Sequence, residues 1–431
     1  MDHAADHADL WDAVDLPAVA AEYGTPLYVY HADVIRRQYA RLAGAFDVPR
    51  LDLHYACKAN TNLAVLRLLR SLGAGLDCVS LDEVRIGLRA GFGASDILYT
   101  PNGVGLAEME EAIRLGVGVN VDSISLLEQL GQRHPEQPVC VRINPHIMAG
   151  GHQKISTGHI DSKFGISIYQ LPHVRRIVEA TGLRVVGVHM HTGSDILEVG
   201  PFLAAAEILL DVAAKFPALE YVDFGSGFKV AYKPGGNATD IEEMGALMSE
   251  RFRRFCADYG REVTLVFEPG KFLVSDAGRF VVEASVVKTT PSTVFVGVDS
   301  GLNHFLRPMF YDAYHHIDNL TNPGGRSRIY TVVGYICETD TFANNRPLPE
   351  VREGDLLAFR NAGAYCMTMA SNYNSRARPA EVMIERGEAH LVRRRETLDD
   401  VLATQTGGEL FADGPRRAAP PADRNPAPAT A

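Results

Sequence analysis

Eight short apolar runs, separated by segments with helical periodicity, constrain the fold of this chain more than any other feature. Two of the intervening segments, which begin at Asn62 and Phe202, place apolar residues at the spacing of one helix face. Eight strands that alternate with helices over about 250 residues predict a closed parallel (β/α)8 barrel. A doubly wound open sheet is the alternative, because periodicity alone does not reveal closure. The runs begin at Leu51, Gly75, Asp96, Gly118, Pro138, Arg184, Leu219 and Val263.

The pattern changes near Ser275, where runs rich in β-branched residues follow one another with only turn residues between them. Such runs predict an all-β domain, and the early run TPLYVYH from Thr25 is expected to pair with it. The chain is therefore predicted to be α/β plus all-β, a TIM barrel followed by a C-terminal β domain. The expected divisions are an N-terminal segment at 1–30, the barrel at 31–275, the β domain at 276–412 and a disordered Pro/Ala-rich tail at 413–431.

Charge and composition narrow the class of partner and the compartment. A formal net charge of −11 over 431 residues opposes nucleic acid or an anionic membrane as a main partner, since both need basic surface. The six cysteines include no CxxC pair, which is typical of reduced thiols in a cytosol. The acidic N-terminus does not resemble a signal peptide, and no apolar run approaches the roughly 20 residues of a membrane helix. We expect a cytoplasmic protein.

Polar residues follow most of the predicted strands, at the end of a barrel where active sites lie. Lys58 directly follows the first strand, and partial desolvation there would lower the pKa of its amine and favour Schiff-base chemistry. Taken alone, a lysine on a loop is more often a surface residue. The remaining strand ends carry Asp77, Arg142 with Asn144, His189 with His191, Asp223 to Gly227, and Glu268 to Lys271.

Two glycine loops, FGSGF at 224–228 and EPGK at 268–271, follow the last two strands of the barrel. Glycine lets backbone N–H groups approach phosphate oxygens closely, and barrels often bind phosphate at these two loops. Ordinary turn glycines are the alternative for each loop alone. Glu268 could hold a pyridine nitrogen protonated, or it could form a structural salt bridge.

His189 and His191 are alternate residues of one strand and therefore share a face. No third or fourth ligand accompanies them at a recognisable spacing, so we expect no metal site. An imidazole packed flat on a cofactor ring fits one of the two better, and the residues alone do not say which. In the β domain, the residues alone do not single out Arg307, Tyr311, Cys337, Glu338 or Tyr365.

These motifs together resemble the diaminopimelate decarboxylase family, which are pyridoxal-phosphate enzymes of the alanine-racemase-like fold type. The resemblance runs from GTPLYVY at Gly24 to RPAEVMI at Arg378, through YACKAN, HMHTGSDI, FGSGF, EPGK and CETDTF. Two longer blocks, GLNHFLRPMFYDAYH and NAGAYCMTMASNYNSRARPAEV, make it specific. It implies a carboxy-lyase that converts meso-diaminopimelate to L-lysine and carbon dioxide, the last step of lysine biosynthesis, with pyridoxal 5'-phosphate as cofactor.

The resemblance also implies roles for individual residues. Lys58 would bind the cofactor covalently with Asp77 as its partner, and Cys337 would return a proton to the substrate carbon. The ring and its substituents would be held by His191, Glu268, Arg142 and Tyr365. The phosphate would be held by Ser194, Gly225, Ser226, Gly227 and Gly270. The substrate would be bound by Lys271, Arg307, Tyr311, Glu338 and Tyr365.

In this family the Cys-Glu segment and Tyr365 reach the site across a subunit interface, which implies an obligate homodimer with shared active sites. Three departures loosen the substrate assignment: Lys271 where Arg is usual, Ser226 where Gly is common, and Thr-Asp-Thr-Phe after Glu338. Relatives that act on ornithine, lysine or carboxynorspermidine often lack the Arg307–Tyr311 pair.

Two further classes stay open at this point. A racemase of the same fold would need a tyrosine as its second base, and the Cys337-Glu338 pair opposes it. A catalytically inactive regulator would have no need of Lys58, Glu268 and Cys337.

Overall fold

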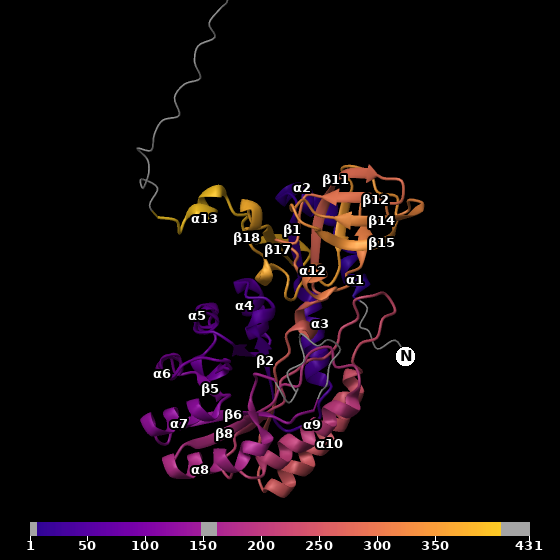
Figure 1. Ribbon diagram of the computed structural model, residues 1–431. Coiled ribbons are helices and arrows are strands. Elements are labelled where there is room, and N and C mark those ends of the chain that lie inside the picture. The colour runs from indigo at the N-terminus through magenta and orange to yellow at the C-terminus, as the bar shows by residue number, and fades with distance from the viewer. Residues whose placement is uncertain (1–6, 148–161, 407–431) are drawn as a thin grey trace, which may run out of the picture.

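A closed parallel barrel with helices around it forms the lower part of the molecule in Figure 1. This computed structural model describes residues 7–147 and 162–406. Strand β10 pairs with β2, and β5 pairs with β6, so the sheet closes on itself and the open-sheet alternative is wrong. Each of the eight predicted runs contains a strand: β2 (Leu51–Ala56), β3 (Gly75–Cys78), β4 (Ile97–Tyr99), β5 (Gly118–Val121), β6 (Pro138–Asn144), β8 (Arg184–His189), β9 (Tyr221–Asp223) and β10 (Thr264–Phe267).

The barrel helices begin and end at residues suited to those positions. Ser80 and Ser123 accept hydrogen bonds from the backbone N–H three residues on, which satisfies a donor that the first helical turn leaves unpaired. Gly91 and Gly182 follow their helices with φ of 100° and 77°, in the left-handed region that favours glycine. The helices are α3 (Ala32–Gly44), α4 (Leu63–Ser71), α5 (Leu81–Ala90), α6 (Leu106–Arg114), α7 (Ile124–Arg133), α8 (Leu171–Thr181), α9 (Val199–Ala213) and α10 (Ile241–Tyr259).

A mixed β sheet stands above the barrel in Figure 1, and one of its interior strands comes from the start of the chain. Strand β1 (Leu27–His31) pairs antiparallel with β11 (Gly278–Thr289) and parallel with β17 (Ala380–Glu385). All five residues of β1 are buried, as its unbroken apolar run requires. The other strands are β12 (Val294–Val298), β13 (Ile317–Asn319), β14 (Ser327–Val333), β15 (Thr341–Pro349), β16 (Leu356–Phe359) and β18 (Glu388–Arg393).

Several short elements were not predicted from the sequence, among them α1 (Ala8–Trp11), α2 (Leu16–Tyr23), β7 (Ile166–Ser167), α11 (Lys271–Val274), α12 (Arg307–Tyr311) and α13 (Leu398–Leu402). The predicted tail at 413–431 lies outside the described residues. In the part of the chain that the structure describes, no helix is both long enough and apolar enough to span a bilayer.

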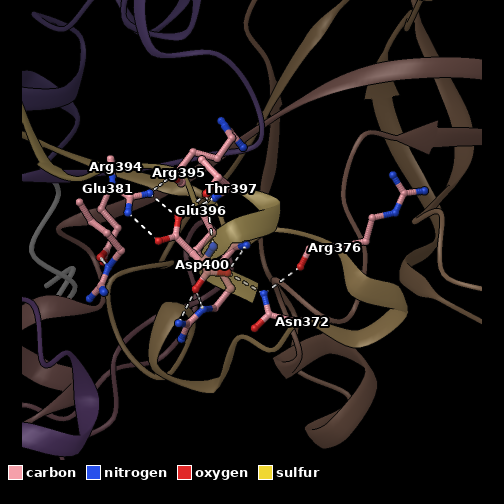
Figure 2. A network of polar contacts seen from close by, with 10 residues as sticks. Asn372, Arg376, Glu381, Arg394, Arg395, Glu396, Thr397 and Asp400 are labelled. Atoms are coloured by element: carbon pink, nitrogen blue, oxygen red, sulfur yellow. Dashed lines mark hydrogen bonds and ion pairs between the residues drawn. The ribbon is translucent and has the colours of Figure 1, made fainter. Parts of the chain in front are cut away.

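A buried carboxylate joins the barrel to the β sheet. Glu381 on β17 is fully buried and accepts hydrogen bonds from the Tyr30 hydroxyl at 2.7 Å and the Asn62 amide at 3.0 Å. It also pairs with Arg393 on β18. Asn62 caps α4 with its side-chain oxygen, so one residue connects Glu381 to the start of a barrel helix. Figure 2 shows Glu381 within a wider network that includes Glu396 and Asp400.

Glu381→Ala is expected to lower the free energy of unfolding by about 1–3 kcal/mol, because it leaves the buried Tyr30 hydroxyl and Asn62 amide without their acceptor. Glu388→Ala, on the neighbouring strand where the side chain is 81% exposed, is the matched control and should change stability by less than about 0.5 kcal/mol. Urea unfolding followed by circular dichroism measures both. Equal losses for the two variants would contradict a central role for Glu381.

Candidate active site

A cavity of about 810 Å³ lies where the carboxyl ends of the barrel strands meet the β domain. Barrel residues and β-domain residues both line it, so neither part forms the site alone. The predicted site residues on its walls are Lys58, Asp77, Arg142, His191, Ser194, Glu268, Lys271, Arg307, Tyr311 and Tyr365. A smaller adjoining hollow is lined by Ser226, Gly227 and Gly270.

Lys58 lies in a short 3-10 turn after β2, with its ammonium 3.2 Å from the Asp77 carboxylate at the end of β3. The two residues meet because β2 and β3 pair in parallel with Ala56 beside Asp77. Burial alone would lower the pKa of Lys58, but the negative charges of Asp77 and Glu268 outweigh it and raise the pKa. The predicted lowering is therefore wrong for the protein without cofactor: Lys58 is held as an ammonium.

The turn that carries Lys58 is fastened to the β domain. The Tyr365 N–H donates to the Ala59 carbonyl at 2.8 Å, and the Asn60 amide donates to the Gly363 carbonyl at 3.2 Å. Tyr365 consequently lines the cavity of its own chain, beside Lys58. The expectation that Tyr365 comes from a second subunit is wrong, because its backbone is bonded to the same turn.

Glu268 and His189 line the cavity, and Asp223 lies close to both of them. The His189 Nε2 lies 3.1 Å from one Glu268 oxygen, and both side chains are almost fully buried. Although burial would raise the pKa of Glu268, the charge of His189 and its hydrogen bond lower it, so Glu268 is ionised. Burial, reinforced by the Glu268 charge, raises the pKa of Asp223 well above its usual range, so Asp223 is neutral.

Among the described residues, no grouping with metal-like spacing holds both His189 and His191. One such grouping is His189, Asp223 and Glu268, whose ligand atoms lie within 4.8 Å of one another, and the other is Cys57, Cys78 and Glu83; His189 and Glu268 already hydrogen-bond to each other. His191 lines the cavity and is neutral, because burial and the positive charge of Arg142 lower its pKa to about 3. A neutral imidazole facing the cavity suits packing against an aromatic ring.

The FGSGF loop can only be built with glycine at two positions. Gly225 and Gly227 have φ of 63° and 127°, in the region that favours glycine. A Cβ on Gly227 would lie 2.1 Å from the Gly193 carbonyl oxygen, so the loop packs tightly against the segment that carries Ser194. The Ser226 N–H meanwhile donates to His191 at 3.4 Å. The loop, Ser194 and His191 thus form one wall, as a phosphate site at the end of a barrel requires.

Two cations and one carboxylate, Arg307, Lys271 and Asp195, also line the cavity. Arg307, on α12, is 8% exposed, and its guanidinium lies 5.3 Å from the Tyr232 ring centroid and 5.7 Å from that of Tyr311. Lys271 pairs with Asp195 at 2.7 Å. Lys271, predicted as a direct carboxylate ligand, is therefore engaged by Asp195 in the cofactor-free protein.

Cys337 and Glu338 do not reach the cavity of their own chain. Both are exposed on a loop after β14. The Cys337 sulfur contacts the Asn374 side chain, and Glu338 accepts a hydrogen bond from the Tyr373 hydroxyl at 2.5 Å. Two of the predicted functional residues thus lie on the surface of the protomer.

Asp195, Tyr232 and Tyr314 line the cavity but were not singled out from the sequence. Asp195 directly follows Ser194 in HMHTGSDI. Its acidic side chain was the one feature of the sequence that could have marked it as a site residue. The two tyrosines carry no pattern that marks them, because they reach the site through long-range packing.

Comparisons with known proteins agree with this geometry. A family model described as pyridoxal-dependent decarboxylase, pyridoxal binding domain, matches residues 32–275. A diaminopimelate decarboxylase of Methanothermobacter thermautotrophicus is 42% identical over 91% of this chain and 94% of the relative, and one of Escherichia coli K12 is 37% identical over 91% and 96%. The structure of diaminopimelate decarboxylase from Helicobacter pylori complexed with L-lysine is similar with a TM-score of 0.82, 31% identity, and coverage of 90% and 98%.

The two buried carboxyl groups should affect the pH dependence of stability in opposite directions. Glu268 has a lowered pKa, so it stabilises the fold above its unfolded pKa of about 4.3, and this is lost as pH falls. Asp223 has a raised pKa, so its contribution is lost as pH rises above about 3.9. Urea unfolding of cofactor-free protein from about pH 7 to 3 should lose less stability in Glu268→Gln than in wild type, and more in Asp223→Asn. The same slope in both variants would refute these protonation states.

Proposed function

The chain belongs to the diaminopimelate decarboxylases of the pyridoxal-dependent decarboxylase family, and from this we propose how its own site decarboxylates meso-diaminopimelate to L-lysine. The single observation that carries the proposal is the set of charged side chains that line one cavity: Lys58 and Glu268 line it together with Arg307 and Lys271. A substrate with an amino-acid group at each end can meet both sets at once.

The residues present fit pyridoxal phosphate. One Glu268 oxygen is buried without a hydrogen-bond partner among the described residues, and an ionised carboxylate suits a protonated pyridine nitrogen. Lys58 would hold the aldehyde carbon, His191 would pack on the ring, and Arg142 would lie near the phenolic oxygen. When bound, the cofactor supplies an electron sink for the bond that breaks. The phosphate would be held by Ser194, Gly225, Ser226, Gly227 and Gly270.

The protein's own groups have distinct tasks in this reaction. Asp77 lies against the Lys58 amine and would accept a proton from it. The amine must lose a proton before it can act as a nucleophile. Burial around Glu268 excludes water, so its charge is little screened. Cys337 would donate a proton to the substrate carbon, because a thiol is a weak acid that can act as a general acid.

The charged group formed by Arg307, Lys271 and Asp195 favours diaminopimelate over simple diamine precursors. These side chains line the cavity and carry two positive charges and one negative charge. A carboxylate is attracted to this group, whereas the lone side-chain ammonium of lysine or ornithine is not. The cations would hold the carboxylate that stays in the product.

The site would be completed by a second copy of the chain. Cys337 and Glu338 are exposed and away from their own cavity, and both are needed for the roles proposed above. A two-fold dimer allows each chain to contribute them to its partner's site. This supports a homodimer with two shared active sites, in which Glu338 would bind the distal amino group.

We further propose that the enzyme works in the cytoplasm. Its six cysteines are all unpaired, and four of them are buried, as in proteins of reducing compartments. We also propose the divisions given above, with the N-terminal segment at 1–30, the barrel at 31–275 and the β domain at 276–412.

Purified protein loaded with pyridoxal phosphate should release carbon dioxide from meso-diaminopimelate and not from ornithine, lysine or arginine. Manometric or enzyme-coupled detection of carbon dioxide measures this, with Lys58→Ala as the control for background release. Release from another amino acid alone would keep the cofactor chemistry and assign the chain to a related decarboxylase. No release from any of them would favour an inactive regulator.

Hybrid dimers test the shared site. Lys58→Ala and Cys337→Ala homodimers should each be nearly inactive. A hybrid of the two, co-expressed with different tags, has one site with both changes and one with neither. It should show about half of the wild-type activity if Cys337 acts in the partner's site. Inactive hybrids would place both residues in one chain's site and overturn the shared arrangement.

A further inference from the structure

His315 lies beside Arg307, in the segment of the chain between α12 and β13. Its ring is 2% exposed and is held from two sides. The Phe305 ring packs edge-on at 4.6 Å between centroids, and the Tyr232 ring does so at 5.1 Å. The His315 backbone is also fixed, because its carbonyl accepts from Arg346 at 2.7 Å. The imidazole therefore has one orientation.

The two ring nitrogens of His315 have different partners. Nδ1 lies 2.8 Å from the Arg360 carbonyl oxygen, which can only accept, so Nδ1 carries the hydrogen. Nε2 is then an acceptor, and the Arg307 Nε–H donates to it at 3.4 Å. Burial, together with the Arg307 charge, lowers the pKa of His315 to about 3, which agrees with a neutral ring.

This contact decides which part of the Arg307 guanidinium is left for a ligand. Its Nε is engaged by His315, and the Tyr232 and Tyr311 rings flank its carbon. Within residues 7–147 and 162–406, neither terminal nitrogen of Arg307 forms a hydrogen bond or ion pair, although Arg307 lines the cavity. Two terminal N–H groups in a plane match the two oxygens of a carboxylate.

We propose that His315 is a positioning residue for substrate selection: as a neutral acceptor it fixes Arg307 by its Nε, so that both terminal nitrogens face the far carboxylate of the substrate. The inference rests on the proposed function in naming that substrate. If His315 only filled space in the core, its replacement would change the binding of every ligand of the cavity by the same factor.

Two ligands isolate the predicted effect. L-Lysine and 1,5-diaminopentane differ only by the carboxylate that Arg307 would bind. In the wild-type holoenzyme, inhibition of decarboxylation and isothermal titration should both show tighter binding of L-lysine. His315→Leu should weaken binding of L-lysine and raise the KM for diaminopimelate by about tenfold or more, the effect of one hydrogen bond to a charged group. Binding of 1,5-diaminopentane should change by less than about twofold, within the scatter of uncoupled changes.

A conservative variant and a neighbouring histidine serve as controls. His315→Gln keeps an acceptor for Arg307 and a donor for the Arg360 carbonyl, and it should recover most of the L-lysine affinity. His316→Leu, at the adjacent residue whose side chain is 29% exposed, should leave both ligands unchanged. Circular dichroism of each variant checks the fold, and His315→Gln keeps the test valid if His315→Leu does not fold.

Several results would overturn the proposal. Equal weakening of both ligands in His315→Leu would mean a packing role only, and unchanged binding of both would mean no role. A glutamine variant no better than the leucine variant would reject the hydrogen bond. The proposed function fails separately, if the wild type binds L-lysine by its carboxylate but does not decarboxylate diaminopimelate.

Discussion

The site depends on the hydrogen bonds that fasten the Lys58 turn to the β domain. Ala59 and Asn60 bind the backbone of Tyr365 and Gly363, and Asn62 reaches the buried Glu381. Tyr365 has φ of 56°, a left-handed conformation that costs about 1 kcal/mol or more for such a residue. It persists because its N–H is bound to Ala59. The same contacts set the position of Lys58 relative to every side chain from the β domain.

Charge pairing in the cavity follows from this arrangement. Lys58 lies against Asp77, Lys271 against Asp195, and Glu268 against His189, so each of these three charges has an opposite charge close by, as low dielectric requires. Arg307 has a neutral imidazole and two aromatic rings in place of a carboxylate. A guanidinium so placed is stabilised best when an anionic ligand binds, which supports the proposed role of Arg307 in holding the substrate carboxylate.

The sequence predicted the barrel because each buried strand is a short apolar run and each helix repeats near 3.6 residues. It predicted the strand-end residues for the same reason, since parallel strands end at one face. The pKa of Lys58 could not be predicted, because it depends on the register that brings Asp77 beside it. The contacts of His315 could not be predicted either, because its two partners come from α12 and from the residue after β16. Nor could the sequence show that Tyr365 lines the cavity of its own chain, because this depends on one backbone hydrogen bond to Ala59.

The loop that carries Cys337 is exposed and yet firmly built. Asp340 is 3% exposed, and its carboxylate accepts hydrogen bonds from the backbone N–H groups of Leu302 and Ile336. These bonds hold the loop in place. Glu338 and Cys337 in turn contact Tyr373 and Asn374 on a second loop. A surface residue without a function rarely has such contacts. A group that binds in another molecule's site gains affinity when it is held in its bound position beforehand. These contacts of an exposed thiol support the proposal that Cys337 acts in a cavity other than its own.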